Sequence, residues 1–160
     1  MLYLGIDPGL SEVGFGIVKS EKGKLEFVDC GIIKTTPKED FPERLSIIKA
    51  DMAEILAMHK YAAVGIEELF FVKNVTNGIK VAHARGVILE AVHAKGIPIH
   101  EMKPKEIKNN ICGYGGADKR QMQEMVKRLL GLNVLPKPHD AADALGAAIC
   151  VARMDRGGAF

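Results

Sequence analysis

Residues 2–9, LYLGIDPG, combine a short apolar run with a single carboxylate and an abrupt stop. The first five residues of this stretch predict a buried strand, and Pro8-Gly9 predicts the turn that ends it. Asp7 stands between the strand and the turn, and a buried carboxylate is costly unless another group compensates its charge. A strand that ends on an acid therefore points to a partner for that acid.

The rest of the chain predicts more strands first and alternating helices and strands afterwards. Short connections join the first strand to two further ones, at 14–20 and 25–34, which indicates an antiparallel meander. Pro42 suits the first turn of a helix that runs to about residue 60, and Asp40 suits its cap. The remaining elements are expected as strands at 62–67 and 97–101 and as helices at 76–95, 104–111, 118–130 and 138–153. This order predicts an α/β fold with a mixed five-stranded sheet flanked by helices.

Length and composition indicate an ordinary globular protein. Of the 160 residues, 48% are hydrophobic and 26% are charged, so we expect a single domain over residues 1–160. No apolar run reaches the roughly 18 residues that a membrane span needs, and the N-terminus lacks the pattern of a signal peptide. The three cysteines form no CxxC pair, which predicts free thiols and a cytoplasmic protein without a membrane partner.

Positive charge is concentrated in the middle of the chain. Residues 1–71 carry a net charge of −4, residues 72–128 carry +6, and residues 129–160 are balanced. A basic segment of this kind suits contact with a polyanion such as DNA. A solvated lysine-rich face explains the same charges equally well, so charge alone leaves both interpretations open.

Acidic residues recur where the predicted strands and the last helix would meet. Asp7 ends the first strand, and Glu67, with Glu68 beside it, ends the fourth. Asp140 and Asp143 stand three residues apart at the start of the last helix, so they share one face near its positive end. If the first and fourth strands are neighbours, these carboxylates converge and raise one another's pKa unless a cation neutralises them.

Divalent metal ions would resolve this repulsion between carboxylates. Mg²⁺ binds through a few carboxylate oxygens and keeps positions for water and phosphate oxygens. Two such ions, about 3.5–4 Å apart, can hold the attacking and leaving oxygens of a phosphodiester and lower the pKa of a bound water. The pattern therefore predicts a metal-dependent site for phosphodiester hydrolysis, although each acid alone is also explained as a turn residue, a solvated strand end or a helix cap.

Two positions stay open from the residues alone. Strand alternation sends only one of Glu67 and Glu68 toward the site, and the pattern does not say which. His139 precedes Asp140 and is either a further metal ligand or simply the residue at the start of the helix, and we favour the second interpretation.

Four segments together resemble one known family. GIDPGLSEVGFGIV at 5–18, IEELFFVKN at 66–74, ARGV at 84–87 and HDAADALGAAI at 139–149 are similar, in order and spacing, to the RuvC-type Holliday junction resolvases. GIDPG alone also resembles the phosphate loop of actin-like ATPases and sugar kinases, but those need a second domain of comparable size. The resemblance implies a ribonuclease H-like fold and an endonuclease that resolves four-way DNA junctions by paired symmetric nicks in recombination and repair.

The resemblance also assigns roles to the acids. The catalytic and metal-binding quartet of the family, carried over position by position, falls on Asp7, Glu67, Asp140 and Asp143, which favours Glu67 over Glu68. The family further implies two Mg²⁺ or Mn²⁺ ions per active site, a homodimer, and the RuvA–RuvB branch-migration complex as a partner. Small residues along 76–95 make that helix a candidate dimer interface, with burial inside the monomer as the alternative.

Aromatic and basic residues supply candidate DNA contacts. The resemblance points to Phe70 as a residue that stacks on or wedges between bases, whereas Phe71 is expected in the core. Lys108 and Lys119 match basic positions that the family uses near the scissile phosphate, where a lysine neutralises developing charge. Further candidate contacts to backbone phosphates are Lys73, Lys80, Arg85, Lys105 and Arg120. Each of these side chains is also explained as part of a solvated surface.

Two other functions fit parts of the sequence. One is a nuclease of the same fold that acts on RNA–DNA hybrids or pre-ribosomal RNA, against which the basic middle segment and IEELFF argue. The other is a non-catalytic protein that holds branched DNA. Four acids beside bound phosphates would weaken such binding unless metal ions neutralised them, so the intact quartet argues against this second alternative.

Overall fold

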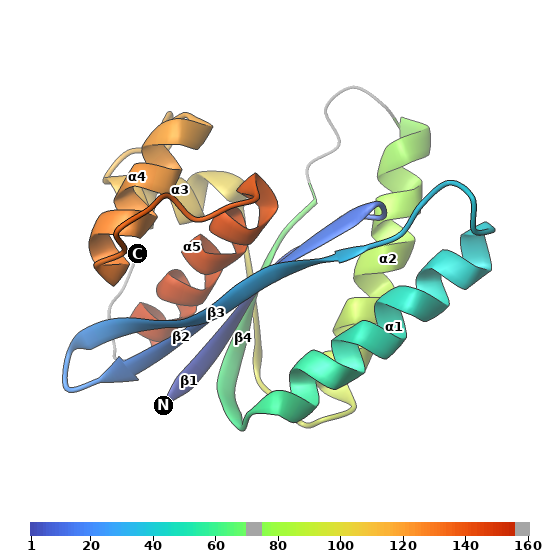
Figure 1. Cartoon of the computed structure of the whole chain (residues 1–160), viewed down its shortest axis with the longest axis horizontal. Helices are drawn as coiled ribbons and strands as arrows, with labels where there is room; N and C mark the ends of the chain where they lie inside the picture. Colours follow the sequence, from blue (N-terminus) through green and yellow to red (C-terminus); the bar gives the residue numbers. More distant parts are fainter. Residues whose placement is uncertain (70–74, 156–160) are drawn as a thin grey trace.

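A five-stranded mixed sheet forms the centre of the computed structural model, which describes residues 1–69 and 75–155 (Figure 1). The strand order is β3-β2-β1-β4-β5, in which β1 to β3 form an antiparallel meander, β4 is parallel to β1, and β5 is parallel to β4. The strands are β1 (Leu2–Asp7), β2 (Glu12–Glu21), β3 (Lys24–Lys34), β4 (Tyr61–Glu67) and β5 (Ile99–Met102). The expected α/β class and the mixed five-stranded sheet are thus confirmed.

Helices cover both faces of the sheet (Figure 1). α1 (Phe41–Met58) and α2 (Val75–His93) lie on one face, and α3 (Pro104–Cys112), α4 (Lys119–Leu130) and α5 (His139–Met154) lie on the other. None of the helices in the described ranges is long and apolar enough to cross a membrane.

The ends of the elements differ from the sequence-based expectation by a few residues. β5 begins at Ile99, two residues after the predicted start, and α2 ends at His93, two residues before the predicted end. The start of α1 agrees with its predicted cap, because the Asp40 side chain accepts a hydrogen bond from the backbone N–H of Glu43. Element ends are decided by a few terminal hydrogen bonds, so local patterns locate them less well than element centres.

A row of glycines lets α5 lie directly on the sheet. Gly5 of β1 is paired with Gly16 of β2 on one side and with Gly65 of β4 on the other. A Cβ atom added to Gly5 would lie 1.9 Å from the carbonyl oxygen of Ala144 in α5. The helix backbone therefore occupies the space that side chains at this row would fill, and the fully buried alanines of α5 complete the close contact.

Large aliphatic side chains fill the opposite face of the sheet instead. The fully buried residues of this layer include Leu4, Ile6, Ile17, Ile66, Ile48, Met52 and Ile88. They come from the sheet and from the apolar stripes of α1 and α2. The two helices are thus separated from the strands by a full layer of side chains, as in an ordinary protein core.

Candidate active site

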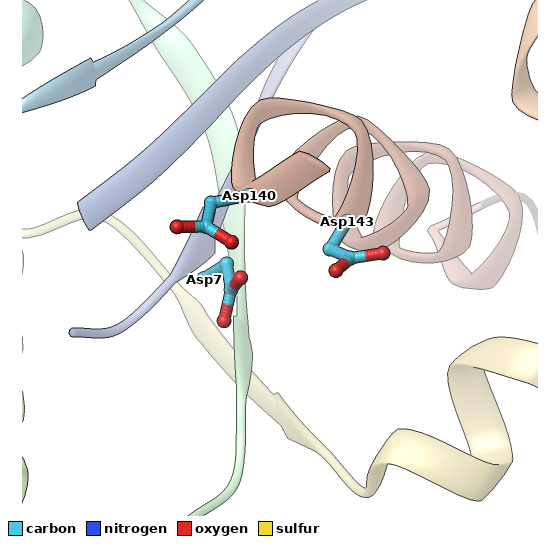
Figure 2. Close-up of side chains that lie close together, drawn as sticks. All are labelled: Asp7, Asp140 and Asp143. Atoms are coloured by element: carbon cyan, nitrogen blue, oxygen red, sulfur yellow. The ribbon is translucent and has the colours of Figure 1, made fainter. Parts of the chain in front are cut away.

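Three aspartates from β1 and α5 meet at one end of the sheet, where Figure 2 shows them side by side. One carboxylate oxygen from each of Asp7, Asp140 and Asp143 lies within 4.8 Å of the others. Gly14 is the sheet partner of Asp7, and a Cβ on it would lie 2.1 Å from the backbone oxygen of Asp140. The missing side chain at Gly14 therefore lets the first turn of α5 come down beside the end of β1.

Glu67 joins these aspartates in one hollow, although it is not a member of the tight group of three. It ends β4, the parallel neighbour of β1, so its carboxylate is delivered to the same edge as Asp7. The hollow has a volume of about 300 Å³. Its lining residues are Asp7, Glu67, Pro104, Ile107, Lys108, Lys119, Met122, Asp140 and Asp143.

Glu68 is placed differently from its neighbour. It is absent from the lining of the hollow, and its backbone N–H donates to the carbonyl oxygen of Met102 at 2.8 Å. The structure thus brings Glu67, and not Glu68, to the acidic hollow.

Burial and repulsion from neighbouring acids raise the pKa of three carboxylates in the hollow, those of Asp7, Glu67 and Asp143. Burial, followed by the charges of Glu67, Asp143 and Asp140, raises the pKa of Asp7 to about 8. Burial and then the charge of Asp143 raise the pKa of Glu67 to about 7, and burial also raises the pKa of Asp143. A divalent cation would remove this repulsion, and oxygen ligands gathered at one point are the donor set that such a cation prefers. The residues present therefore fit a metal ion.

Two lysines bring positive charge to the same hollow. Lys108 comes from α3 and Lys119 from the first turn of α4, and both line the hollow together with the acids. Both lower the pKa of Glu67 and of Asp143, against the stronger effect of burial. Their ammonium groups thus stand where a phosphate that entered the hollow would need charge compensation.

Three apolar residues of this lining were not singled out from the sequence. Pro104 and Ile107 of α3 and Met122 of α4 form part of the wall, and Ile107 and Met122 are buried. The positions of Ile107 and Met122 on amphipathic helices identify these two as core residues, which they also are. Only the packing of α3 and α4 beside α5 shows that the same side chains border the acids.

The other candidate residues lie outside the acidic hollow. Lys80 of α2, Lys105 of α3 and Arg120 of α4 are exposed. His139 is exposed at the first turn of α5 and does not belong to the group of three aspartates. The expectations for Phe70, Phe71 and Lys73 concern residues outside the described part of the chain.

Arg85 has partners within the fold. Its guanidinium forms an ion pair with the carboxylate of Glu101, and its Nε donates to the backbone oxygen of Glu67 at 3.4 Å. The side chain thereby ties α2 to β5 and to the end of β4. This bridge supports the strand end that carries the catalytic candidate Glu67.

The strand order, the helix that lies across it and the acids at one edge define a class of proteins. The fold is ribonuclease H-like, and in this chain two neighbouring strand ends and a crossing helix bring carboxylates to one edge of the sheet. The family model described as crossover junction endodeoxyribonuclease RuvC matches residues 3–151, and the chain belongs to this family. Nucleases of this family are metal-dependent, in keeping with the acidic cluster.

Relatives of known name agree over nearly the whole chain. The crossover junction endodeoxyribonuclease RuvC of Roseiflexus sp. is 46% identical over 147 residues, which cover 92% of this chain and 88% of that protein. The protein of the same name from Chloroflexus aurantiacus is 48% identical over 150 residues, covering 94% and 92%.

Solved structures show the same similarity. Thermus thermophilus RuvC in complex with Holliday junction substrate has a TM-score of 0.92 at 34% identity, covering 99% of this chain and 96% of that one. The yeast mitochondrial Holliday junction resolvase Ydc2, at a TM-score of 0.71 and 15% identity, covers 96% and 80% and shares the fold.

Proposed function

We propose that this chain is a metal-dependent endonuclease that resolves four-way DNA junctions by paired symmetric nicks during recombination and repair. The observation that carries the proposal is the hollow in which four acids and two lysines meet, in a chain of the RuvC family. The similarity to a RuvC solved with a Holliday junction substrate supports the choice of a four-way junction over other nucleic acids.

Asp7, Glu67, Asp140 and Asp143 are proposed to hold two Mg²⁺ or Mn²⁺ ions. When bound, such ions act as Lewis acids on the phosphodiester and lower the pKa of the attacking water. The chain itself contributes the orientation of the acids, because β1, β4 and α5 fix their backbones. Lys108 and Lys119 are proposed to neutralise charge that develops on the scissile phosphate.

The remaining DNA contacts are proposed on family resemblance and charge. Phe70 is the proposed stacking residue, and Arg85 would contact DNA only if its pairing with Glu101 opened or was shared. The proposed contacts to backbone phosphates outside the hollow are Lys73, Lys80, Arg85, Lys105 and Arg120. Such contacts fix the position of the junction without reading its sequence.

A homodimer is proposed because two symmetric cuts require two active sites, which a twofold interface supplies. Ala84 and Ala91 of α2 are buried within the monomer, so only part of the small-residue face is free. Val75 and Ile79 of α2 are 68% and 50% exposed, and these apolar side chains support an interface on the outer face of the helix. Sedimentation of the protein at several concentrations tests this proposal.

The remaining proposals concern the setting in which the enzyme works. We propose a single nuclease domain over residues 1–160 and, from family membership, the RuvA–RuvB branch-migration complex as a partner that hands over the junction. We propose the cytoplasm as its location, because its named relatives are bacterial DNA-processing enzymes and its substrate is DNA.

A synthetic four-way junction tests the function directly. We expect the protein to nick two opposing strands of an end-labelled junction when Mg²⁺ is present and to leave it intact in EDTA. Duplex DNA and an RNA–DNA hybrid of the same sequence serve as competitors. Preferential cleavage of the hybrid would support the ribonuclease alternative, and binding without nicks in Mg²⁺ would support a non-catalytic junction binder.

Paired substitutions test the assignment of the acids. Asp7→Asn and Glu67→Gln should retain junction binding and lose cleavage by at least about 10³-fold, since each loss of about 1.4 kcal/mol in transition-state stabilisation costs tenfold. Glu68→Gln is the matched control, because it makes the same change one residue away and outside the lining of the hollow. Cleavage at the wild-type rate by Asp7→Asn would refute the assignment.

A further inference from the structure

A second hollow adjoins the acidic one on another side of Asp140. It has a volume of about 510 Å³ and lies between the turn after β1 and the end of β3. Its lining residues are Gly9, Leu10, Ser11, Glu12, Lys34, Thr35, Thr36 and Asp140. Asp140 lines both hollows, so a strand whose phosphate sits among the acids has this second hollow as an adjacent place for its backbone.

A buried arginine lies beneath this second hollow. Arg44 of α1 is only 9% exposed, and its Nε donates to Thr35 Oγ1 at 2.8 Å while one Nη donates to Ser11 Oγ at 2.8 Å. Within residues 1–69 and 75–155, no carboxylate forms an ion pair with it. The nearby Glu39, whose pKa is lowered by local hydrogen bonds and then by the charge of Arg44, compensates part of this charge without forming an ion pair with it. A buried cation bonded to neutral hydroxyls therefore keeps part of its positive charge beside the hollow.

The Ser11 hydroxyl accepts a hydrogen bond from Arg44 and still has its own proton to donate to a ligand. Thr35 Oγ1 already donates its proton to the backbone oxygen of Leu10 at 2.6 Å. Ser11 Oγ accepts from Arg44, so its own proton is left to point elsewhere, and Ser11 is exposed at the hollow. A hydroxyl that accepts from a guanidinium is polarised, which makes it a stronger donor to an anion.

The charges around the hollow permit an anion. Lys34 Nζ lies 3.7 Å from Glu12 Oε1 in an exposed pair, so these two charges compensate each other and the lysine can still turn to a ligand. Asp140 would oppose an anion on its own, but in the proposed function its charge is shared with metal ions. The carboxylate of Glu39, which accepts from the Thr36 N–H at 2.6 Å, interacts with Arg44 and offsets part of its charge. Arg44 still forms no ion pair within residues 1–69 and 75–155.

We propose that this second hollow receives a backbone phosphate that flanks the scissile phosphate on the same DNA strand. Ser11 donates a hydrogen bond to the flanking phosphate, Lys34 supplies the outer charge, and Arg44 is a positioning residue that holds and polarises Ser11 from below. This subsite rests on the proposed junction cleavage and adds a contact that orients the strand across Asp140.

Single methylphosphonate substitutions in the junction test the subsite, because each removes the charge of one phosphate. Single-turnover cleavage is measured in Mg²⁺ at increasing protein concentration, which separates the half-saturating concentration from the maximal rate. For the wild-type protein, we expect one neutralised phosphate near the cut to raise the half-saturating concentration about tenfold, as expected for a charge-assisted hydrogen bond.

Variants of the second hollow should lose that sensitivity. Ser11→Ala and Lys34→Met should each raise the half-saturating concentration for the unmodified junction and should show little further loss with the neutralised phosphate. Lys34→Met should also lower the slope of log affinity against log salt by about one. Lys38→Met is the matched control, because it removes an exposed lysine close to the hollow but outside its lining.

The outcomes separate this subsite from the proposed function. If the wild-type protein cuts the unmodified junction but no single flanking phosphate is sensitive, or if Ser11→Ala and Lys34→Met stay as sensitive as the wild type, the subsite is overturned while the function stands. If the wild type cuts no junction at all, the proposed function fails first. Arg44→Lys adds a test of positioning, with thermal unfolding measured in parallel, and Ser11→Ala keeps the test decisive if that variant is unstable.

Discussion

The two faces of the sheet are packed in different ways. On the face under α5, the glycine row Gly16, Gly5 and Gly65 brings helix and strand backbones into direct contact. On the face under α1 and α2, a full layer of Leu, Ile and Met side chains separates helices from strands. The acids lie at the end of the first face, where α5 reaches the ends of β1 and β4.

This difference shows that the charged site depends on a short distance between the backbones of a helix and a strand. Aspartate side chains are short, so carboxylates from a strand and from a helix meet only if their backbones are close. A helix held off by a layer of isoleucines would carry Asp140 and Asp143 away from Asp7. Close packing on one face therefore serves the site, and ordinary packing on the other serves stability. The two faces should respond differently to substitution.

Gly5→Ala is expected to have the largest effect on stability. The added Cβ would lie 1.9 Å from the Ala144 oxygen and 2.4 Å from the Ala148 nitrogen, so α5 must move. We expect a loss of about 4 kcal/mol or more in the free energy of unfolding, in the range that marks severe overpacking, together with loss of cleavage. Urea denaturation and the junction assay measure the two effects, and wild-type values for both would contradict the close-packing explanation.

Ile88→Ala tests the opposite face by removing volume instead of adding it. Ile88 is fully buried in the layer between α2 and the sheet, so we expect a loss of about 2–5 kcal/mol. Because the acids lie at the end of the opposite face, under α5, the folded variant should keep its maximal cleavage rate. A variant that was fully folded and yet unable to cleave would show that the two faces are not separate in function.

The pH dependence of stability in the metal-free protein tests the acidic edge of the sheet separately from the two packed faces. The folded-state pKa of Asp7 is raised to about 8 and that of Glu67 to about 7, whereas both carboxyl groups have a pKa of about 4 in the unfolded chain. The folded protein therefore binds more protons than the unfolded chain over this interval, so stability is highest below about pH 4 for these groups and falls as pH rises toward 8.

Thermal unfolding in EDTA should thus show a midpoint temperature that falls from pH 5 to pH 8. The free energy of unfolding falls over this interval by at most about 1.4 kcal/mol per group for each pH unit. Mg²⁺ should raise the midpoint more at pH 8 than at pH 5, because it binds the ionised acids. Asp7→Asn should flatten the slope in EDTA and raise the midpoint at pH 8. A midpoint that fell with Mg²⁺ or stayed level in EDTA would argue against a buried acidic cluster.

Gly86→Ala is expected to have the smallest effect and the opposite sign. This glycine lies in α2 with no heavy atom within 4 Å of an added Cβ. Alanine in a helix interior is favoured over glycine by about 0.5–1 kcal/mol, so the monomer should become slightly more stable. If sedimentation shows that the same variant loses a wild-type dimer, Gly86 lies in the dimer interface, and if the dimer is kept, it does not.

Much of the fold was predictable because local patterns decide it. Period-3.6 and strand-like apolar runs located, to within a few residues, the five strands and five helices that lie in residues 1–69 and 75–155. Asp40 and Pro42 marked the start of α1. Strands that end on acids, together with Asp140 and Asp143 one turn apart, were enough to predict an acidic edge. The choice of Glu67 over Glu68 needed the resemblance. The alternation of side chains along a strand sends only one of the two toward the site, and it does not say which one unless the register of the strand is known.

Other features depend on residues far apart in the chain. The amino-acid sequence by itself determined which segments form strands and helices and which of them carry acids, because those properties follow from neighbours a few positions away. Only the tertiary structure decided that Gly5, Gly16 and Gly65 line up beneath α5, and that Arg44 lies under Ser11 and Thr35. Register across strands and contacts between layers are set by the packing of the whole core, which no local pattern contains.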